Sequence, residues 1–304
     1  MQITLDSFIK PELGIKRLVK AWKARTDISE TEYRTSKGLS QSELNKFIVS
    51  PMSYLDSLKY PKKPTADMEF GTCFHAMLLD ENPEETFVEM PDFGDKRNPK
   101  NKEDALRWEH ENAGKIHLDS KAKEGQQTDL QRLTNMKNAC QRHEPLLWAF
   151  GEHNDIIKEQ VLYAEIETDN GNILLKGRLD LYSKKLKRIL DYKTTDDASE
   201  AFIRTINTNG YDIQAVQYIF LCLANDMPVD EYHLAAVEKK AKSDTSGSHF
   251  CEIGCYSIDI TKTKKWKQTT PIQNWAKALN DFCVCSSNDI WPSYNGNKVV
   301  EVEL

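Results

Sequence analysis

The chain has 304 residues, 39% of them hydrophobic, and a formal net charge of −6. This length suits one large domain, or one domain with a small appendage, and the negative charge argues against a protein that coats nucleic acid over its whole surface. No stretch approaches the roughly 20 apolar residues of a membrane span, and the first residues lack the apolar block of a signal peptide. We therefore expect a cytoplasmic protein with no membrane partner.

The cysteines of the chain are scattered and lack the repeated short spacing of a disulfide framework. Reduced thiols are therefore expected at Cys73, Cys140, Cys222, Cys251, Cys255, Cys283 and Cys285.

The chain begins with a mixed-charge lead-in over residues 1–35, whose structure the sequence leaves open, and we expect a single domain over residues 36–304. Ser40 and Glu43 have the spacing of a capping box, in which each side chain satisfies a backbone N–H at the start of a helix. Pro51 is expected to bend or end that helix, because proline lacks an N–H and clashes with the preceding turn.

Three further segments complete the first half. Apolar residues at helical spacing predict a compact helix over residues 68–80, and His75 lies beside its apolar stripe. Residues 91–125 are rich in charge, Asn and Gly, so we expect a long loop with at most short elements. A helix is predicted from residue 128 to about 150, with a halt near Pro145.

The centre of the chain changes from a helical period to the twofold period of strands. Three strands joined by short turns, one of them an Asn-Gly turn, predict an antiparallel meander over residues 159–168, 172–182 and 188–195. A helix, two strands and a closing helix are then expected over residues 212–226, 231–240, 250–260 and 272–285. This order predicts an α/β fold with a mixed central sheet, made of the meander, a helix and a further strand, and flanked by helices.

An acidic cluster is expected within the meander. Asp191 and Lys193 are two residues apart on one strand, so their side chains leave the same face. Asp180, on the preceding antiparallel strand, can approach them across a pair whose opposed Cβ atoms are roughly 4.5–5.5 Å apart. Two carboxylates this close repel each other unless a cation lies between them, and oxygen ligands of this kind suit Mg²⁺ or Mn²⁺.

Lys193 extends the possible chemistry of this cluster. Beside a divalent metal, an ammonium group can orient water toward a phosphorus atom and offset the charge that builds on the phosphate oxygens. The triplet therefore suits phosphodiester hydrolysis. A salt-bridged surface hairpin is the alternative interpretation of these three residues taken alone.

Five motifs in order resemble those of the RecB-type nuclease domains in the PD-(D/E)-x-K superfamily. They read Gly71-Thr-Cys-Phe-His75, Glu159, Gly177-Arg-Leu-Asp180, Asp191-Tyr-Lys193-Thr-Thr and Gln214-Ala-Val-Gln-Tyr218. The stretch that begins GKIHLDSKA and the terminal WPSY are similar to the RecE-type branch, exodeoxyribonuclease VIII, and the resemblance extends over residues 36–297.

The resemblance implies roles for these residues. Asp180 and Asp191 would be the main metal ligands, together with the backbone carbonyl of Tyr192 and the side chain of His75. Glu159 would bind or steer a second metal or its water. The remaining roles are Lys193 as the catalytic lysine, Gln214 and Tyr218 as catalytic residues that face the DNA, and Arg178 and Thr194 as further DNA contacts.

The resemblance also implies an activity. It describes a Mg²⁺-dependent exonuclease, with Mn²⁺ as a substitute, that degrades one strand of linear double-stranded DNA from its 5′ end and leaves a 3′ single-stranded tail. A single-strand-annealing recombination protein would receive that tail. Family members are ring-shaped oligomers, often tetramers, and occur in phages and prophages within bacterial hosts.

Two cofactors are not expected. The cysteine spacing differs from that of relatives that hold an iron–sulfur cluster, and no P-loop pattern for ATP is present. Two other functions stay open: an endonuclease or single-strand-end nuclease with the same metal centre, and a DNA-binding module whose nuclease site has decayed.

Basic runs supply a possible DNA surface despite the net charge of −6. If a ring encloses DNA, lysines would line its channel while acidic residues cover the outside. The runs lie at residues 184–188, 239–242 and 262–267.

Overall fold

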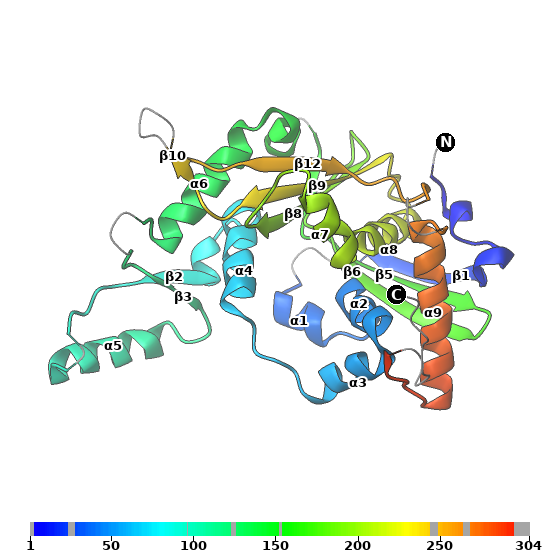
Figure 1. Cartoon of the computed structure of the whole chain (residues 1–304), viewed down its shortest axis with the longest axis horizontal. Coiled ribbons are helices and arrows are strands. Elements are labelled where there is room, and N and C mark those ends of the chain that lie inside the picture. Colours follow the sequence, from blue (N-terminus) through cyan, green and yellow to red (C-terminus); the bar gives the residue numbers. More distant parts are fainter. Residues whose placement is uncertain are drawn as a thin grey trace, which may run out of the picture.

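The computed structural model describes residues 3–23, 28–95, 97–122, 126–151, 154–243, 249–263 and 268–294. Within this part of the chain a five-stranded sheet and a three-stranded sheet are surrounded by helices (Figure 1). The α-helices are α1 (Glu30–Thr35), α2 (Gln41–Val49), α3 (Pro51–Lys59), α4 (Ala66–Leu79), α5 (Pro99–Glu111), α6 (Asp129–Arg142), α7 (Phe202–Thr208), α8 (Tyr211–Ala224) and α9 (Pro271–Asn288).

The strands and the short 3₁₀ helices complete the element order. The strands are β1 (Ile15–Lys23), β2 (Phe87–Met90), β3 (Ile116–Asp119), β4 (Ile156–Lys158), β5 (Val161–Thr168), β6 (Gly171–Arg178), β7 (Leu181–Ser183), β8 (Arg188–Thr195), β9 (Glu231–Glu238), β10 (Lys242–Ser243), β11 (His249–Phe250) and β12 (Ile253–Ser257). The 3₁₀ helices are η1 (Leu5–Ser7), η2 (Pro11–Leu13), η3 (Pro83–Glu85) and η4 (Glu144–Phe150).

The five-stranded sheet has the order β12-β9-β8-β7-β4, which places β8 at its centre. Strands β8 and β9 are parallel and are joined by a crossover that contains α7 and α8, whereas the other pairs are antiparallel. This arrangement confirms the predicted α/β fold with a mixed sheet flanked by helices.

The predicted meander is divided between two sheets. Residues 172–182, expected as one strand, form β6 and β7, and the chain changes sheet at Leu179 and Asp180. β6 pairs with β5 in the three-stranded sheet, of order β1-β5-β6, whereas β7 pairs with β8 and β4. The sequence alternation continues through the break, so only the distant pairing partners decide where the strand ends.

Two hydrophobic cores lie on opposite faces of the five-stranded sheet. On β8, Ile189 belongs to the core formed with α2, α8, α9 and the three-stranded sheet, and Leu190 belongs to the core formed with α4 and α6. This alternation follows the twofold period of a strand. The central strand is therefore buried on both faces.

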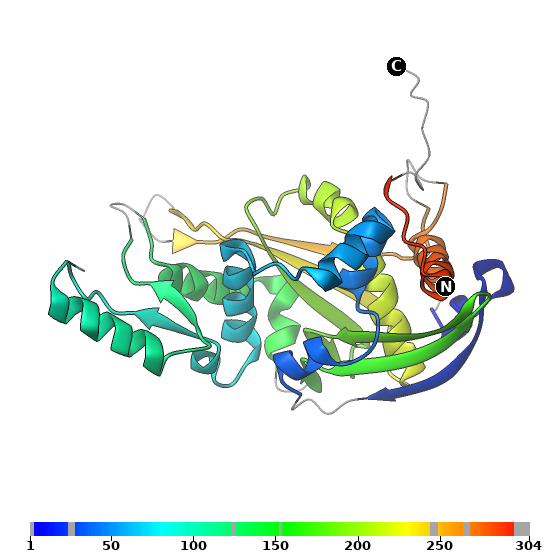
Figure 2. The ribbon, with the colours of Figure 1, turned by 90° about the horizontal axis from the view of Figure 1, so that it is seen from below.

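The N-terminal segment, whose structure the sequence leaves open, packs onto the body of the molecule. β1 pairs with β5 along its length, from Ile15 opposite Thr168 to Lys23 opposite Leu162. Figure 2 shows β1 along the outer side of the three-stranded sheet.

The expectation of a long loop over residues 91–125 is wrong for most of its described part. The segment contains the 13-residue helix α5 and the strand β3, which pairs in parallel with β2. Only Ala105 of α5 is buried, so the helix has no apolar stripe that the sequence could reveal. In Figures 1 and 2 these elements form a lobe that projects from the body. Residues 96 and 123–125 lie outside the described residues.

The helix boundaries predicted from local signals are confirmed. Ser40 and Glu43 form the capping box at the start of α2, and α3 begins at Pro51. The helix expected from residue 128 ends at Arg142, and the 3₁₀ helix η4 contains Pro145. Of the basic run over residues 262–267, the structure describes Lys262, and its other lysines lie outside the described residues. No helix in the described ranges has both the length and the apolar character of a membrane span.

Candidate active site

The predicted site residues come together around the centre of β8, where α4 packs near one side of the strand and α8 near the other. The break between β6 and β7 lies next to this point, because Leu181 of β7 pairs with Leu190 of β8. The antiparallel register therefore places Asp180 opposite Asp191, as expected from the sequence.

Asp180 is anchored to the neighbouring strand by a backbone hydrogen bond. Its Oδ2 accepts the N–H of Tyr192, with 2.8 Å between the two atoms. Its Oδ1 lies 3.5 Å from Nδ1 of His75. One carboxylate thus links β8 to the helix that carries the histidine.

His75 projects from α4 toward β8. Its Nε2 lies 3.1 Å from the carbonyl oxygen of Tyr192, and the ring of Phe74, the preceding residue, packs edge-on against the Tyr192 ring with 6.3 Å between the centroids. Gly71, one turn earlier, faces Thr194: an added Cβ would lie 3.6 Å from its Oγ1, an ordinary contact. The first motif thus forms a helix face that lies against β8.

Asp191 is buried, with 1% of its surface exposed, and it is held from two sides. Nε2 of Gln214, on α8, donates a hydrogen bond of 2.8 Å to its Oδ1, and Nζ of Lys193 lies 2.6 Å from its Oδ2. Lys193 also lies over the ring of Tyr211, 5.0 Å from the centroid. The ammonium therefore has two partners that fix its position.

Burial and neighbouring charges shift the pKa values of these four side chains. Burial raises the pKa of Asp191 to about 6, although Lys193 opposes the shift. Burial would lower the pKa values of Lys193 and His75, but Asp191 and Asp180 respectively outweigh it, so both values are raised. Burial would raise the pKa of Asp180, yet His75 and Lys193 hold it below its usual value. The carboxylates and the two bases thus stabilise one another's charged forms.

The donor atoms at this point suit a hard divalent cation. They are carboxylate oxygens of Asp180 and Asp191, the Tyr192 carbonyl and the imidazole of His75. Asp191 Oδ2 is buried and has the ammonium of Lys193 beside it, 2.6 Å away. A carboxylate oxygen can accept a second partner, so the residues present fit a metal site.

The side chains are not arranged as a closed metal cage. Among the described residues, no group of three or more His, Cys, Asp or Glu side chains is placed to hold a metal ion. Asp180 and His75 satisfy each other and the backbone of Tyr192 instead. The metal ligands therefore stay a prediction.

Glu159 lies at the edge of the site and is engaged elsewhere. Its carboxylate pairs with Arg178, which also pairs with Glu30 of α1. Burial raises the pKa of Glu159, whereas Arg178 lowers it. The roles predicted for Glu159 in metal binding and for Arg178 in DNA binding would require these ion pairs to open.

Tyr218 lies one turn beyond Gln214 on α8 and packs against β6. A Cβ added at Gly177 would lie 3.0 Å from Tyr218 Cε1 and 2.7 Å from Leu221 Cδ1, so only glycine allows β6 and α8 this close approach. The tyrosine is only partly buried. Its predicted contact with DNA stays a prediction, as does that of Thr194.

Two residues near the site belong to none of the five sequence motifs and were not predicted. Tyr211 lies three residues before Gln214, so helical spacing alone would have placed both on one face. Asp80, at the C-terminal cap of α4, is a half-buried carboxylate whose pKa is raised by burial, although the charges of Arg178 and His75 oppose the shift. Its position, five residues after His75 at the end of the same helix, could have indicated that it lies near the site.

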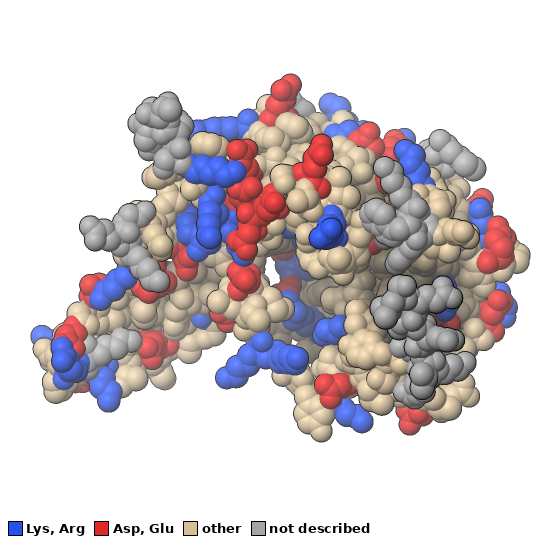
Figure 3. Space-filling model, in the orientation of Figure 1, with Lys and Arg blue, Asp and Glu red and all other residues tan. Residues whose placement is uncertain are grey.

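A cleft of about 520 Å³ opens beside α4 and reaches the site. Figure 3 shows the surface hollowed there. Its lining joins α4, the end of β8 and the α7–α8 region, and includes Gly71, His75, Tyr192, Lys193, Thr194 and Tyr211. A polymer could therefore approach Lys193 from solvent.

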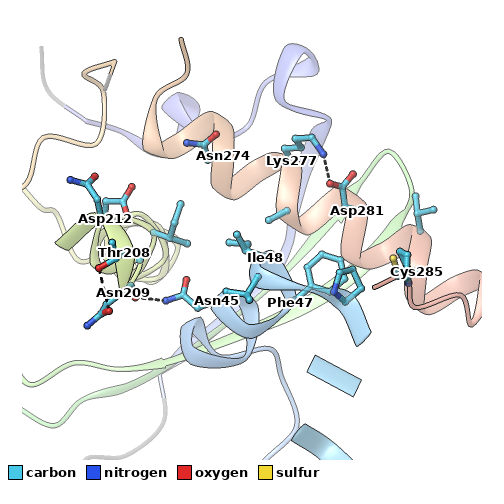
Figure 4. Close-up of a pocket in the computed structure, with 18 residues that line it drawn as sticks. Asn45, Phe47, Ile48, Thr208, Asn209, Asp212, Asn274, Lys277, Asp281 and Cys285 are labelled. Carbon is cyan, nitrogen blue, oxygen red and sulfur yellow. Dashed lines mark hydrogen bonds and ion pairs between the residues drawn. The ribbon is translucent and has the colours of Figure 1, made fainter. Parts of the chain in front are cut away.

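A second cavity, of about 510 Å³, lies between α2, α9 and the α7–α8 junction (Figure 4). None of the predicted site residues lines it. Its polar groups largely satisfy one another: Asn45 donates to the carbonyl of Asn209, and Lys277 pairs with Asp281. It is therefore a weaker candidate for chemistry than the cleft.

The mixed sheet, the crossover helix α8 and the acidic pair beside Lys193 define a nuclease fold of the PD-(D/E)-x-K type. The chain belongs to the family of the PDDEXK-like domain of unknown function (DUF3799), whose model matches residues 40–297.

Two solved structures are similar to the chain at low identity. A protein described as a "Putative exonuclease" from Eubacterium rectale is 11% identical, with a TM-score of 0.49, over 91% of this chain and 96% of that one. The protein SSO0001 is 10% identical, with a TM-score of 0.29, over 80% of this chain and 93% of that one. Identities this low transfer no activity to this chain. A search of curated proteins gives no match.

Proposed function

We propose that the chain is a metal-dependent exodeoxyribonuclease that cleaves phosphodiester bonds in linear double-stranded DNA without ATP. The observation that carries the proposal is an acidic pair, Asp180 and Asp191, directly behind the wall of an open cleft. Lys193 and His75, which pair with these aspartates, line the cleft together with Tyr192. A buried ion pair of purely structural value would not need a cleft that leads to it.

The side chains have distinct roles in this proposal. Asp180, Asp191, His75 and the Tyr192 carbonyl would hold Mg²⁺, which Mn²⁺ can replace, and the metal supplies Lewis-acid activation of the scissile phosphate. Lys193 would stabilise the charge that develops on the phosphate oxygens. Gln214 orients Asp191 through its hydrogen bond.

The more specific assignment is to the RecE type. It rests on the order of the five sequence motifs and on their resemblance to that branch. On this basis the enzyme degrades the 5′-ended strand, leaves a 3′ single-stranded tail for a strand-annealing partner, and acts as a ring-shaped oligomer, as a tetramer in the simplest case. Its setting would be a phage or prophage recombination system in the cytoplasm of a bacterial host.

One experiment separates the proposal from its alternatives. Linear duplexes labelled at either the 5′ or the 3′ end, and a closed circular duplex, are incubated with the protein and Mg²⁺, then with EDTA in place of Mg²⁺. We expect early loss of the 5′ label, slow loss of the 3′ label, an intact circle and no reaction with EDTA. Cleavage of the circle would indicate an endonuclease, and no hydrolysis with any divalent metal would indicate a decayed site.

A further inference from the structure

The connection between α3 and α4 is an exposed loop beside the cleft. It comprises residues 60–65, with the sequence YPKKPT, and every residue from 58 to 68 is exposed. Two of its residues are prolines, which fix φ and restrict the residues before them. The connection therefore presents its side chains to solvent with less freedom than an ordinary loop of this length has.

Three lysines on this connection and at its start make no internal ion pair. Lys59 ends α3, and Lys62 and Lys63 follow within the connection. None of the three pairs with an acidic side chain in the described ranges, whereas Lys239, which lines the cleft, pairs with Asp67 and Asp196. Their positive charge is thus available to an external anion.

The position of the connection links it to the catalytic residues. It leads directly into α4, and Asp67 and Met68 of the first turn of α4 line the same cleft as His75 and Lys193. Figure 3 shows Lys and Arg side chains where Figure 1 places the α3–α4 connection, at the edge of the hollow. A DNA strand that reaches Lys193 along this edge passes the lysines.

Tyr60 adds a flat apolar surface to the charged connection. It is 69% exposed, and its ring makes no aromatic contact with any residue that the structure describes. Bases of a single strand stack on such exposed rings, whereas the bases of a duplex already stack on their neighbours. The pairing of an exposed ring with unpaired lysines therefore favours a single strand over a duplex.

We infer that the α3–α4 connection binds a single-stranded end of the DNA substrate, with phosphates on Lys59, Lys62 and Lys63 and a base on Tyr60. This inference rests on the proposed function, since it assigns the connection to the same substrate. It identifies where the strand lies outside the cleft and what chemistry holds it.

The test measures binding in EDTA, where metal-dependent hydrolysis cannot interfere. A fluorescent 20-nucleotide single strand and a blunt duplex of the same length are titrated with the wild type, K62E/K63E, Y60A and the control K100E/K102E. The control reverses two exposed lysines of α5, which belong to none of the basic runs and do not line the cleft. Thermal melting confirms that every variant is folded.

We expect K62E/K63E to raise the Kd for the single strand at least 10-fold and to reduce the salt slope by about 1.4, since each phosphate contact on a single strand contributes about 0.7. Y60A is expected to raise the single-strand Kd about 5-fold or more with little effect on the blunt duplex. The control should stay within twofold of the wild type.

Values for K62E/K63E and Y60A that match the control would overturn the inference, and so would a loss confined to the duplex. The proposed function fails in a different way. In that case the wild type does not hydrolyse linear DNA with any divalent metal, and this result does not depend on the affinities of K62E/K63E and Y60A for the single strand.

Discussion

Gln214 donates a buried hydrogen bond of 2.8 Å to Asp191, which connects the crossover helix α8 to the central strand β8. The bond occupies Oδ1, and Oδ2 faces Lys193. In the proposed function, the glutamine therefore determines which oxygen of Asp191 faces the metal.

Replacement of Gln214 by Leu should reduce kcat on linear duplex DNA about 10- to 100-fold, because residues that orient metal ligands have effects of that size. Gln217→Leu is the matched control on the same helix. Gln217 donates to the carbonyls of Leu39 and Lys176 and does not contact the site. The control should lower the melting temperature but keep kcat per folded molecule. Equal kcat values for the two variants would contradict the role of Gln214.

Lys193→Ala and Asp191→Asn should each abolish Mg²⁺-dependent degradation, with a loss of about 10²-fold or more. Binding of duplex DNA in EDTA should change little, since neither side chain offers much surface to DNA: Lys193, which lines the cleft, has 18% of its side chain exposed, and Asp191, which lies behind it, has 1%. End-labelled degradation and fluorescence anisotropy measure the two properties separately. Wild-type degradation by both variants would refute the assignment of the site.

The two motif glycines should respond to alanine in opposite directions. Gly177→Ala places a methyl group 2.7 Å from Leu221 Cδ1 and should lower the free energy of unfolding by about 1–3 kcal/mol through overpacking. Gly71→Ala meets only an ordinary contact at 3.6 Å, and alanine is the better helix former, so a gain of about 0.5–1 kcal/mol is expected. Urea unfolding of both variants checks the signs. Destabilisation by both would show that α4 packs too closely against β8 at Gly71 to accommodate a methyl group.

Tyr211 is expected to position the ammonium of Lys193 through its ring. Tyr211→Leu should lower kcat about 2- to 30-fold, from a cation–π contact of about 0.5–2 kcal/mol, with a smaller change in KM. Tyr211→Phe keeps the ring and should restore most of the rate. Steady-state kinetics on linear duplex DNA give both parameters. A Phe variant as slow as the Leu variant would assign the effect to the hydroxyl group instead.

Local sequence signals predicted the parts of the fold that depend on neighbouring residues. The capping box of Ser40 and Glu43, the start of α3 at Pro51 and the common strand of Asp191 and Lys193 all follow from spacings of a few residues. These features depend only on residues that are close in sequence, so they can be predicted without knowing the contacts between distant segments.

Features that depend on distant contacts were not predictable. The chain changes sheet at Asp180 because β6 and β7 pair with different partners, although the strand pattern continues. Tyr211 reaches Lys193 only because the chain turns between α7 and α8 at Gly210, which has a φ of 66°. The ion pairs of Arg178 with Glu30 and Glu159 likewise join segments that are far apart in sequence.

The family match begins at residue 40, yet the strand β1 before it pairs with β5 of the three-stranded sheet. Without β1, the strand β5 would become an unprotected border whose free N–H and C=O groups invite intermolecular pairing. Lys176 would also lose the carbonyl of Ser36, 2.6 Å from its Nζ, and would stay buried with an unsatisfied charge. A truncated protein cut at the family boundary is therefore expected to aggregate, and material for crystallisation or assays should retain the N-terminal strand.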